Sequence, residues 1–159
     1  MDFFLEVNAS ENIDFQKKYK GFYRMRFLEN DFIDIYFSFL EEHKTINIKP
    51  TFHNTLEYFF KKFNRVECSF ISKLLATLDQ NLPIWDSNVL RILSIKKPLK
   101  DKLNESVVIY NNLVEWNNDF ISSEEGCKWV KFFNEEYTNS NITPIKKIDL
   151  ILWKLGSGR

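Results

Sequence analysis

The chain has 159 residues, of which 44% are hydrophobic and 28% charged, a balance that suits one globular domain with a sizeable core. Only four glycines and four prolines are present, too few for a β-sandwich or a glycine-rich phosphate loop, so the composition predicts helices. The formal net charge is zero, which excludes the strongly basic profile of a protein that binds nucleic acid through its overall charge.

Apolar residues at helical spacing predict about seven helices in an all-α bundle. Residues 1–28 leave helical and extended backbone both open. The first clear helix covers residues 29–44, and a second over residues 52–63 follows Pro50, with Thr51 as its cap. A third begins near residue 67 and ends at Leu78, before a polar turn.

Four further helices are predicted in the second half of the chain. Asp86 directly precedes a short helix over residues 87–93, and a long aromatic helix follows from about residue 99 to 121. Ser122 and Glu125 have the spacing of a capping box that opens the next helix. Thr143 and Pro144 open the last one, which ends at Gly156. We therefore expect a compact single domain over residues 1–156 and a flexible tail at 157–159.

The reactive side chains give no pattern for a metal or a cofactor. Cys68 and Cys127 belong to no CxxC motif, and the two histidines, His43 and His53, add no ligand set, so no metal site and no cofactor are expected. Both cysteines are expected to be reduced and packed in the core. No stretch has the length and apolarity of a membrane span, and the first residues lack the features of a signal peptide. The sequence therefore predicts a cytoplasmic protein without a membrane partner.

Positive charge is concentrated in two runs, here named the 17–26 run and the 91–102 run. They contain Lys17, Lys18, Lys20, Arg24 and Arg26, and Arg91, Lys96, Lys97, Lys100 and Lys102. Such runs either bind phosphates or form solvated helix faces. DNA is the partner that the first interpretation implies.

Residues 69–93 carry the most informative pattern in the chain. A helix leads through a polar turn to the extended tripeptide Pro83-Ile84-Trp85, then to Asp86 and a short helix that carries Val89 and Arg91. The stretch resembles the second half of the signature of helix-hairpin-helix DNA glycosylases, in which an aspartate opens a helix within a pattern such as V-D-x-x-V-x-R. The archaeal 8-oxoguanine glycosylase branch looks nearest. The resemblance implies a glycosylase-like helical fold and a damaged base in DNA as substrate.

The resemblance also assigns roles to individual residues. Asp86 would stabilise the oxocarbenium-like state that forms when the N-glycosidic bond breaks, and it would orient the attacking water. Trp85 would stack on an extruded base. The remaining substrate-binding residues would be Ser69, Ser72, Lys73, Asn88 and Arg91. Lys73 lies closer to Asp86 in the chain than the catalytic lysine of the family does, which favours hydrolysis without a lyase step. The glycine-containing hairpin through which the family binds phosphate is missing, and residues 65–69, which contain no glycine, stand in its place.

Each of these residues also has a purely structural interpretation. Asp86 has the position of an ordinary N-cap, Lys73 that of a solvent-facing lysine, and Trp85 that of a core tryptophan. Asp149, beside the apolar stripe of the last helix, predicts an ion pair at the edge of that stripe. Two other functions therefore stay open: a helical DNA-binding or regulatory module without catalysis, and a protein-interaction subunit that uses exposed aromatic side chains.

Overall fold

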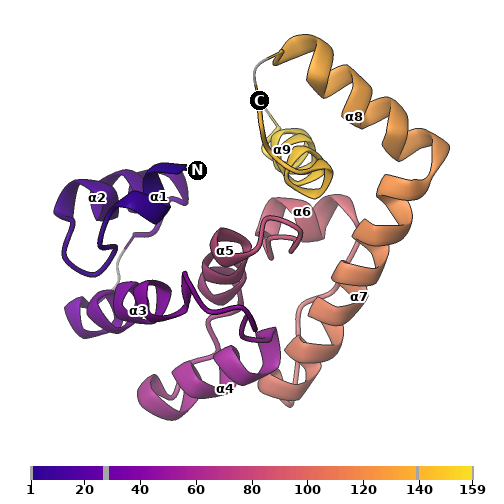
Figure 1. The fold of residues 1–159 in the computed structure, drawn as a ribbon. Helices are drawn as coiled ribbons and strands as arrows, with labels where there is room; N and C mark the ends of the chain where they lie inside the picture. Colours follow the sequence, from indigo (N-terminus) through magenta and orange to yellow (C-terminus); the bar gives the residue numbers. More distant parts are fainter. Residues whose placement is uncertain (1, 27–28, 139, 159) are drawn as a thin grey trace. The chain divides into compact units, whose positions relative to one another are not determined.

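All regular structure in the described part of the chain is helical, which confirms the predicted fold class. The computed structural model describes the backbone of residues 2–26, 29–138 and 140–158. Within these ranges there are nine helices, not about seven. Contacts divide the chain into two compact units, Met1–Thr51 and Phe52–Arg159 (Figure 1). The single domain over residues 1–156 and the flexible tail stay predictions, and the last residue of that tail lies outside the described ranges.

The first unit holds α1 (Asp2–Glu6), α2 (Ile13–Phe22) and α3 (Asn30–His43). Two of these helices lie in the segment whose conformation the sequence leaves open, and residues 1, 27 and 28 of that segment are not described. Asn12 caps α2, because its side chain accepts a hydrogen bond from the Phe15 amide at 2.8 Å. The buried core is aromatic: the hydroxyl groups of Tyr19 and Tyr36 lie 2.9 Å apart, and the ring of Phe37 contacts both side chains edge-on.

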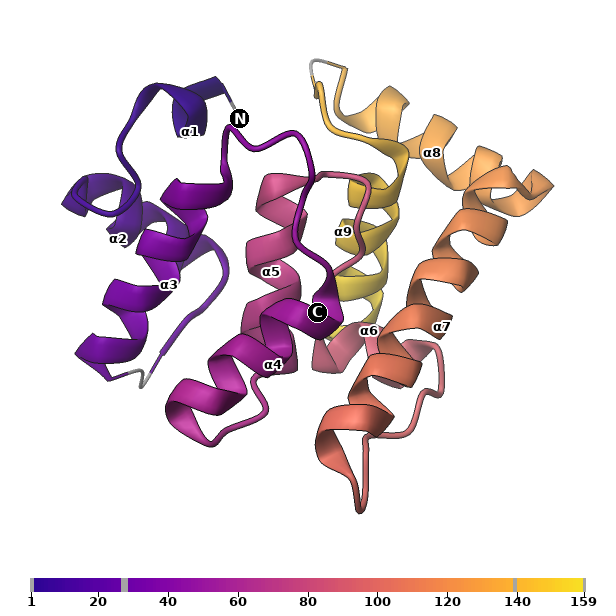
Figure 2. The ribbon, with the colours of Figure 1, turned by 60° about the horizontal axis from the view of Figure 1, so that its bottom comes forward.

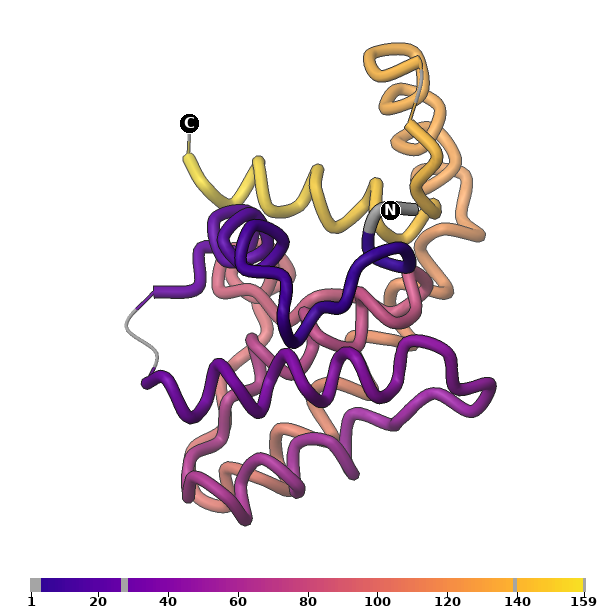
Figure 3. Tube along the Cα trace, turned by 60° about the vertical axis from the view of Figure 1, so that its left-hand side comes forward, coloured from indigo at the N-terminus to yellow at the C-terminus, as the bar shows by residue number. Residues whose placement is uncertain are grey.

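The second unit holds six helices and carries every predicted site residue. They are α4 (Phe52–Phe63), α5 (Cys68–Leu78), α6 (Ser87–Ile92), α7 (Lys102–Ser122), α8 (Glu124–Glu136) and α9 (Pro144–Gly156). The short α6 packs on α9, α4 packs on α5 and α7, and α8 packs on α7 and α9 (Figure 2). The orange α8 and the yellow α9 run in clearly different directions (Figure 3). No helix among the described residues is both long and apolar enough to cross a membrane.

Two details at helix ends correct the predictions. The long helix begins at Lys102 and not near residue 99, because Asp101 caps it through the Asn104 amide at 3.2 Å. The cap of α8 is Ser123, whose hydroxyl accepts the Gly126 amide at 3.0 Å, so the predicted capping box of Ser122 and Glu125 is wrong. Ser122 is still the last residue of α7.

The two cysteines are free and differ in environment. Cys68 is buried, as expected, whereas Cys127 is exposed, so the prediction that both thiols are packed in the core is wrong for Cys127. Burial raises the pKa of the Cys68 thiol, which makes it less reactive.

Candidate functional site

The segment that leads to Asp86, residues 83–86 (the 83–86 segment), is fastened to three helices. The Trp85 amide donates to Ser72 Oγ on α5 at 2.9 Å, and the Ile84 amide donates to Asp149 Oδ2 on α9 at 3.1 Å. The hydroxyl of Tyr110 on α7 donates to the Pro83 carbonyl at 3.0 Å. Three successive residues of an irregular segment thus each have a backbone group that is hydrogen-bonded to a side chain of a helix. These bonds fix the position of the backbone at Asp86.

Asp86 is the N-cap of α6. Its Oδ1 accepts the Asn88 amide at 2.8 Å, and its backbone is extended, as the cap position requires. The side chain is half-buried. The structural interpretation of Asp86 is therefore confirmed, and it does not oppose a role in chemistry, because the cap bond uses one of the two carboxylate oxygens.

Lys73 lies in the interior beside Asp86. The residue is only 7% exposed, so the interpretation as a solvent-facing lysine is wrong. Burial lowers its pKa, and the negative charge of Asp86 acts in the opposite direction. The Nζ atom also lies 5.6 Å from the centre of the Phe70 ring. A lysine in this position releases its proton more easily than an exposed one, and a neutral amine is a nucleophile.

Trp85 belongs to the core. It is 6% exposed, and its ring is parallel to that of Phe52, with centroids 6.4 Å apart. Phe52 in turn stacks on Tyr110 at 3.8 Å. In this conformation no face of the indole is open to a base, so the structural interpretation of Trp85 is confirmed and base stacking stays a prediction.

The other predicted residues are linked to these three. Ser72 is buried, and its hydroxyl donates to the Ser69 carbonyl at 3.0 Å. Arg91 is exposed and donates to Asn88 Oδ1 at 3.3 Å. The backbone of Asn88 lies against Gly156 of α9, where a Cβ would come within 2.5 Å of the Asn88 carbonyl oxygen. All seven predicted residues therefore lie in one region of the second unit. Hydrogen bonds link Ser69, Ser72 and Trp85 in one series, and Asp86, Asn88 and Arg91 in another, with Lys73 beside Asp86.

The prediction that Asp149 forms an ion pair at the exposed edge of the apolar stripe is wrong. It is 4% exposed, and its Oδ1 has no hydrogen-bond partner among the described residues. The positive charge of Lys146 acts on it from one helical turn earlier on α9, and Lys146 is itself 8% exposed. Burial raises the pKa of Asp149 to about 7, while Lys146 and the bond from the Ile84 amide lower it and Asp86 raises it further. Burial also lowers the pKa of Lys146.

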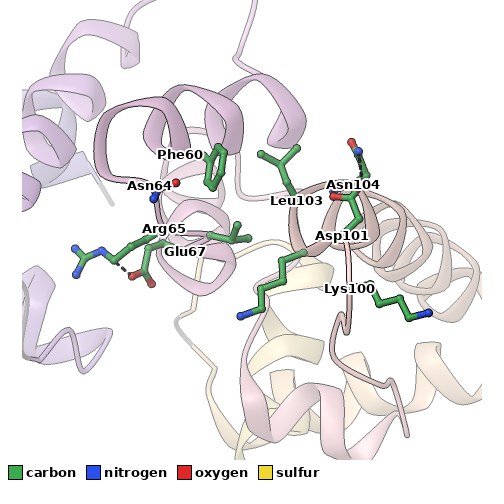
Figure 4. A pocket seen from close by; sticks show the side chains of 10 residues that line it. Phe60, Asn64, Arg65, Glu67, Lys100, Asp101, Leu103 and Asn104 are labelled. Carbon is green, nitrogen blue, oxygen red and sulfur yellow. Dashed lines mark hydrogen bonds and ion pairs between the residues drawn. The ribbon is translucent and has the colours of Figure 1, made fainter.

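A pocket of about 760 Å³ opens at the other end of α5 (Figure 4). Its lining comes from the end of α4 and the turn to α5 (Phe60, Asn64, Arg65, Val66, Glu67) and from the start of α7 (Lys100, Asp101, Lys102, Leu103, Asn104). Three of these side chains are cationic and two are anionic. Arg65 Nε lies 3.6 Å from Glu67 Oε1, and Figure 4 shows this pair and Lys100 on opposite sides of the opening.

No protein-family model matches the chain. Comparisons with curated proteins and with solved structures likewise found no relative.

The pocket and the buried lysine of α9 are the features that sequence reasoning missed. The pocket joins residues 60–67 to residues 100–104. The sequence drew attention to residues 65–69 as the place of the family's hairpin and to Lys100 and Lys102 as part of the 91–102 run, but nothing in it brought the two segments together. The sequence does not indicate that Lys146 is buried, because two adjacent lysines on a helix normally point to solvent on at least one side. In the structure both Lys146 and Lys147 are buried. Lys147 is accounted for by a hydrogen bond to Asn134 Oδ1 at 2.6 Å.

Proposed function

We propose that the chain binds DNA and hydrolyses the N-glycosidic bond of a damaged base, with Asp86 as the reacting carboxylate. The observation that carries the proposal is the position of Asp86: a half-buried carboxylate at a helix start, on a segment fastened to three helices, beside the buried Lys73. Preorganised charge of this kind stabilises a cation that develops in a transition state.

The chemistry follows from the charges. As the bond between C1′ and the base nitrogen breaks, the electron pair leaves with the base, and Asp86 stabilises the positive charge on the sugar. A water molecule then forms the C1′–O bond and gives its proton to Asp86. The departing base takes up a proton from solvent, and Asp86 returns its own proton to solvent. The buried Lys73 lies beside Asp86, and the charges of the two side chains attract each other.

The pocket supports the DNA-binding part of the proposal. Lys100 and Lys102 of the 91–102 run line it together with Arg65, so cations from two distant parts of the chain surround one opening. The turn between α4 and α5 forms one wall and supplies Arg65, although it lacks the glycine-containing hairpin that binds phosphate in the glycosylases. Cations on opposite sides of an opening suit an extended chain of phosphates. The 17–26 run belongs to the first unit and is proposed as a second source of phosphate contacts.

Replacing Lys100 and Lys102 with alanine is expected to weaken DNA binding at all sequences alike. The slope of log K against log salt should decrease by about one for each lysine that contacts a phosphate. The measurement is fluorescence anisotropy of a labelled duplex from 50 to 200 mM salt. The matched control replaces two exposed lysines of α8, Lys128 and Lys131, which each have a glutamate partner on the same helix. Equal slopes in the test and control variants would remove the pocket from the DNA interface.

Base release is the direct test of the catalytic part. Labelled duplexes and single strands with damaged or mismatched bases are incubated with protein at low salt and treated with alkali to break abasic sites. We expect wild type to release one class of base, Asp86→Asn to lose that activity, and the exposed-carboxylate control Glu135→Gln to keep it. Trapping with borohydride shows whether Lys73 forms a Schiff base. DNA binding without base release would favour a non-catalytic module, and neither binding nor release would favour a protein-interaction role.

A further inference from the structure

The side chains of Lys146 and Asp149 form a buried charged pair that is incompletely satisfied. Lys146 Nζ and Asp149 Oδ1 have no hydrogen-bond partner in the part of the chain that the structure describes. Removing a charge from water costs several kcal/mol unless neighbouring groups compensate for it. Groups that persist in such positions are frequently found at functional sites. The proposed reaction does not use either residue.

A hydrogen bond from the Ile84 amide to Asp149 connects this pair to the segment that carries Asp86. The acceptor is Asp149 Oδ2, and Ile84 lies two residues before Asp86 in the same extended segment. The two other tethers of the segment use the hydroxyl groups of Ser72 and Tyr110, and burial raises the pKa of Tyr110 well above its ordinary value, so neither hydroxyl ionises near neutral pH. Asp149 is therefore the one tether of these three whose charge can change.

We propose that Asp149 is a positioning residue for Asp86: its ionised carboxylate holds the 83–86 segment through the Ile84 amide, and its protonation weakens that hold. A hydrogen bond to an ionised acceptor is about twice as strong as one to a neutral acceptor. The proposal rests on the proposed function, since the group being positioned is the reacting carboxylate.

Groups from each neighbouring element determine when Asp149 ionises. Burial is the largest influence and disfavours the charge; on α9 itself, Lys146 favours it. The start of α6 contributes Asp86, which disfavours it, and α7 contributes the neutral hydroxyl of Tyr110. The end of α5 contributes Asp79, whose charge acts on Tyr110.

Among the described residues, the other polar groups on the helices that pack against α9 add no charge that acts on Asp149. On α8 the neutral amide of Asn134 contacts α9 and accepts a hydrogen bond from Lys147. On α6, Arg91 is exposed. With a pKa of about 7, Asp149 changes its charge across neutral pH. The 83–86 segment is then held firmly above pH 7 and less firmly below it.

The test follows the Ile84 amide by NMR from pH 5 to 9, with no DNA present. In wild type the amide proton should move downfield as pH rises, with a midpoint near 7. Asp149→Asn should abolish the inflection. Lys146→Met should move the midpoint upward, because it removes the charge that favours ionisation. Glu135→Gln, an exposed carboxylate on α8, should leave the curve unchanged.

The outcomes separate this proposal from the proposed function. The positioning role is overturned if the amide shows no inflection between pH 5 and 9, or if the inflection persists in Asp149→Asn. If Asp149→Asn does not fold, the Lys146→Met variant decides the question. An Ile84 amide midpoint that is the same in Lys146→Met and wild type would then overturn the positioning role. If the amide titrates as expected, base release by wild type should show an inflection at the same pH that Asp149→Asn lacks. If wild type and Asp149→Asn release the base with the same pH profile, the link between Asp149 and Asp86 is overturned. If the Ile84 amide titrates as expected but no base is released, only the glycosylase assignment is contradicted.

Discussion

Replacing Gly126 with alanine is expected to destabilise the second unit by at least about 3 kcal/mol, more than most single substitutions do. A Cβ at this position would overlap the carbonyl oxygen of Phe120, and it would lie 2.7 Å from the carbonyl carbon of Phe120 and 3.1 Å from Ile121 Cα. These are backbone atoms of the last turn of α7, so no side chain can rotate away. The collision can be relieved only by separating α7 from α8.

The corner between α7 and α8 explains why the two backbones come so close. A single residue, Ser123, joins the helices, and its hydroxyl accepts the Gly126 amide while it donates to the Phe120 carbonyl at 2.7 Å. On the same corner the ring of Phe120 stacks on Trp116 and meets Trp129 edge-on. Separating the helices would therefore break two hydrogen bonds and an aromatic cluster together.

Unfolding in urea measures this effect, with tryptophan fluorescence and far-UV circular dichroism as probes. All four tryptophans lie in the second unit, so fluorescence reports on that unit alone. The matched control is Gly21→Ala in α2, where a Cβ meets nothing within 4 Å; helix propensity predicts a gain of up to about 1 kcal/mol by circular dichroism. A loss of less than about 1 kcal/mol in Gly126→Ala would contradict the close approach of α7 and α8.

Helix positions were predictable where the chain carries a local signal. Asp86 and Thr143 were expected as caps, and both accept the backbone hydrogen bond that a cap requires. The choice between Ser122 and Ser123 failed because adjacent serines offer the same chemistry. In the structure Ser122 donates to the Asn118 carbonyl within α7, which leaves the cap position to Ser123.

The buried face of α7 was less predictable, because two polar residues belong to it. Val107 and Val114 have the apolar spacing of a buried helix face and are only half-buried, whereas the fully buried positions include Ser106 and Asn117. Both side chains donate to carbonyl groups of their own helix, at Lys102 and Leu113, so burial leaves their donors satisfied. No count of apolar residues can anticipate such local pairing.

Burial of charged groups was the other property that the sequence did not reveal. Lys73 has a long apolar stem, and periodicity alone cannot distinguish a lysine that extends to solvent from one that is enclosed. The pocket is likewise a product of long-range packing, since its two walls are about 40 residues apart in the chain. Local pattern located Asp86, and the family resemblance named Ser72 and Lys73 around it. The contacts of Tyr110 and Asp149 with the segment before it came only from the fold.

Ionisation of Asp149 is expected to lower the stability of the second unit as pH rises from 4 to 7, and Asp149→Asn is expected to remove that contribution to the pH dependence. The pKa of Asp149 is about 7 in the folded chain against an ordinary value of 3.8. Between these values the folded chain keeps a proton that the unfolded chain has lost, so folding becomes less favourable as pH increases. The cost is absent below pH 4, complete above pH 7, and on the order of 4 kcal/mol at 1.36 kcal/mol for each pKa unit.

The decisive quantity is the difference in unfolding free energy between Asp149→Asn and wild type, followed by tryptophan fluorescence in urea at pH 4, 5, 6, 7 and 8. Asparagine keeps an acceptor for the Ile84 amide but places an NH₂ group where Oδ1 lacks a partner, which adds a constant offset at every pH. The difference should therefore change in favour of the variant by about 2 to 4 kcal/mol from pH 4 to pH 8, whatever its starting value. In a Lys146→Met background the change should persist and extend to higher pH, because Asp149 then ionises later. A difference that stays constant with pH would mean that Asp149 ionises at its ordinary value, and α9 would then hold the 83–86 segment with the same strength at every pH in the neutral range.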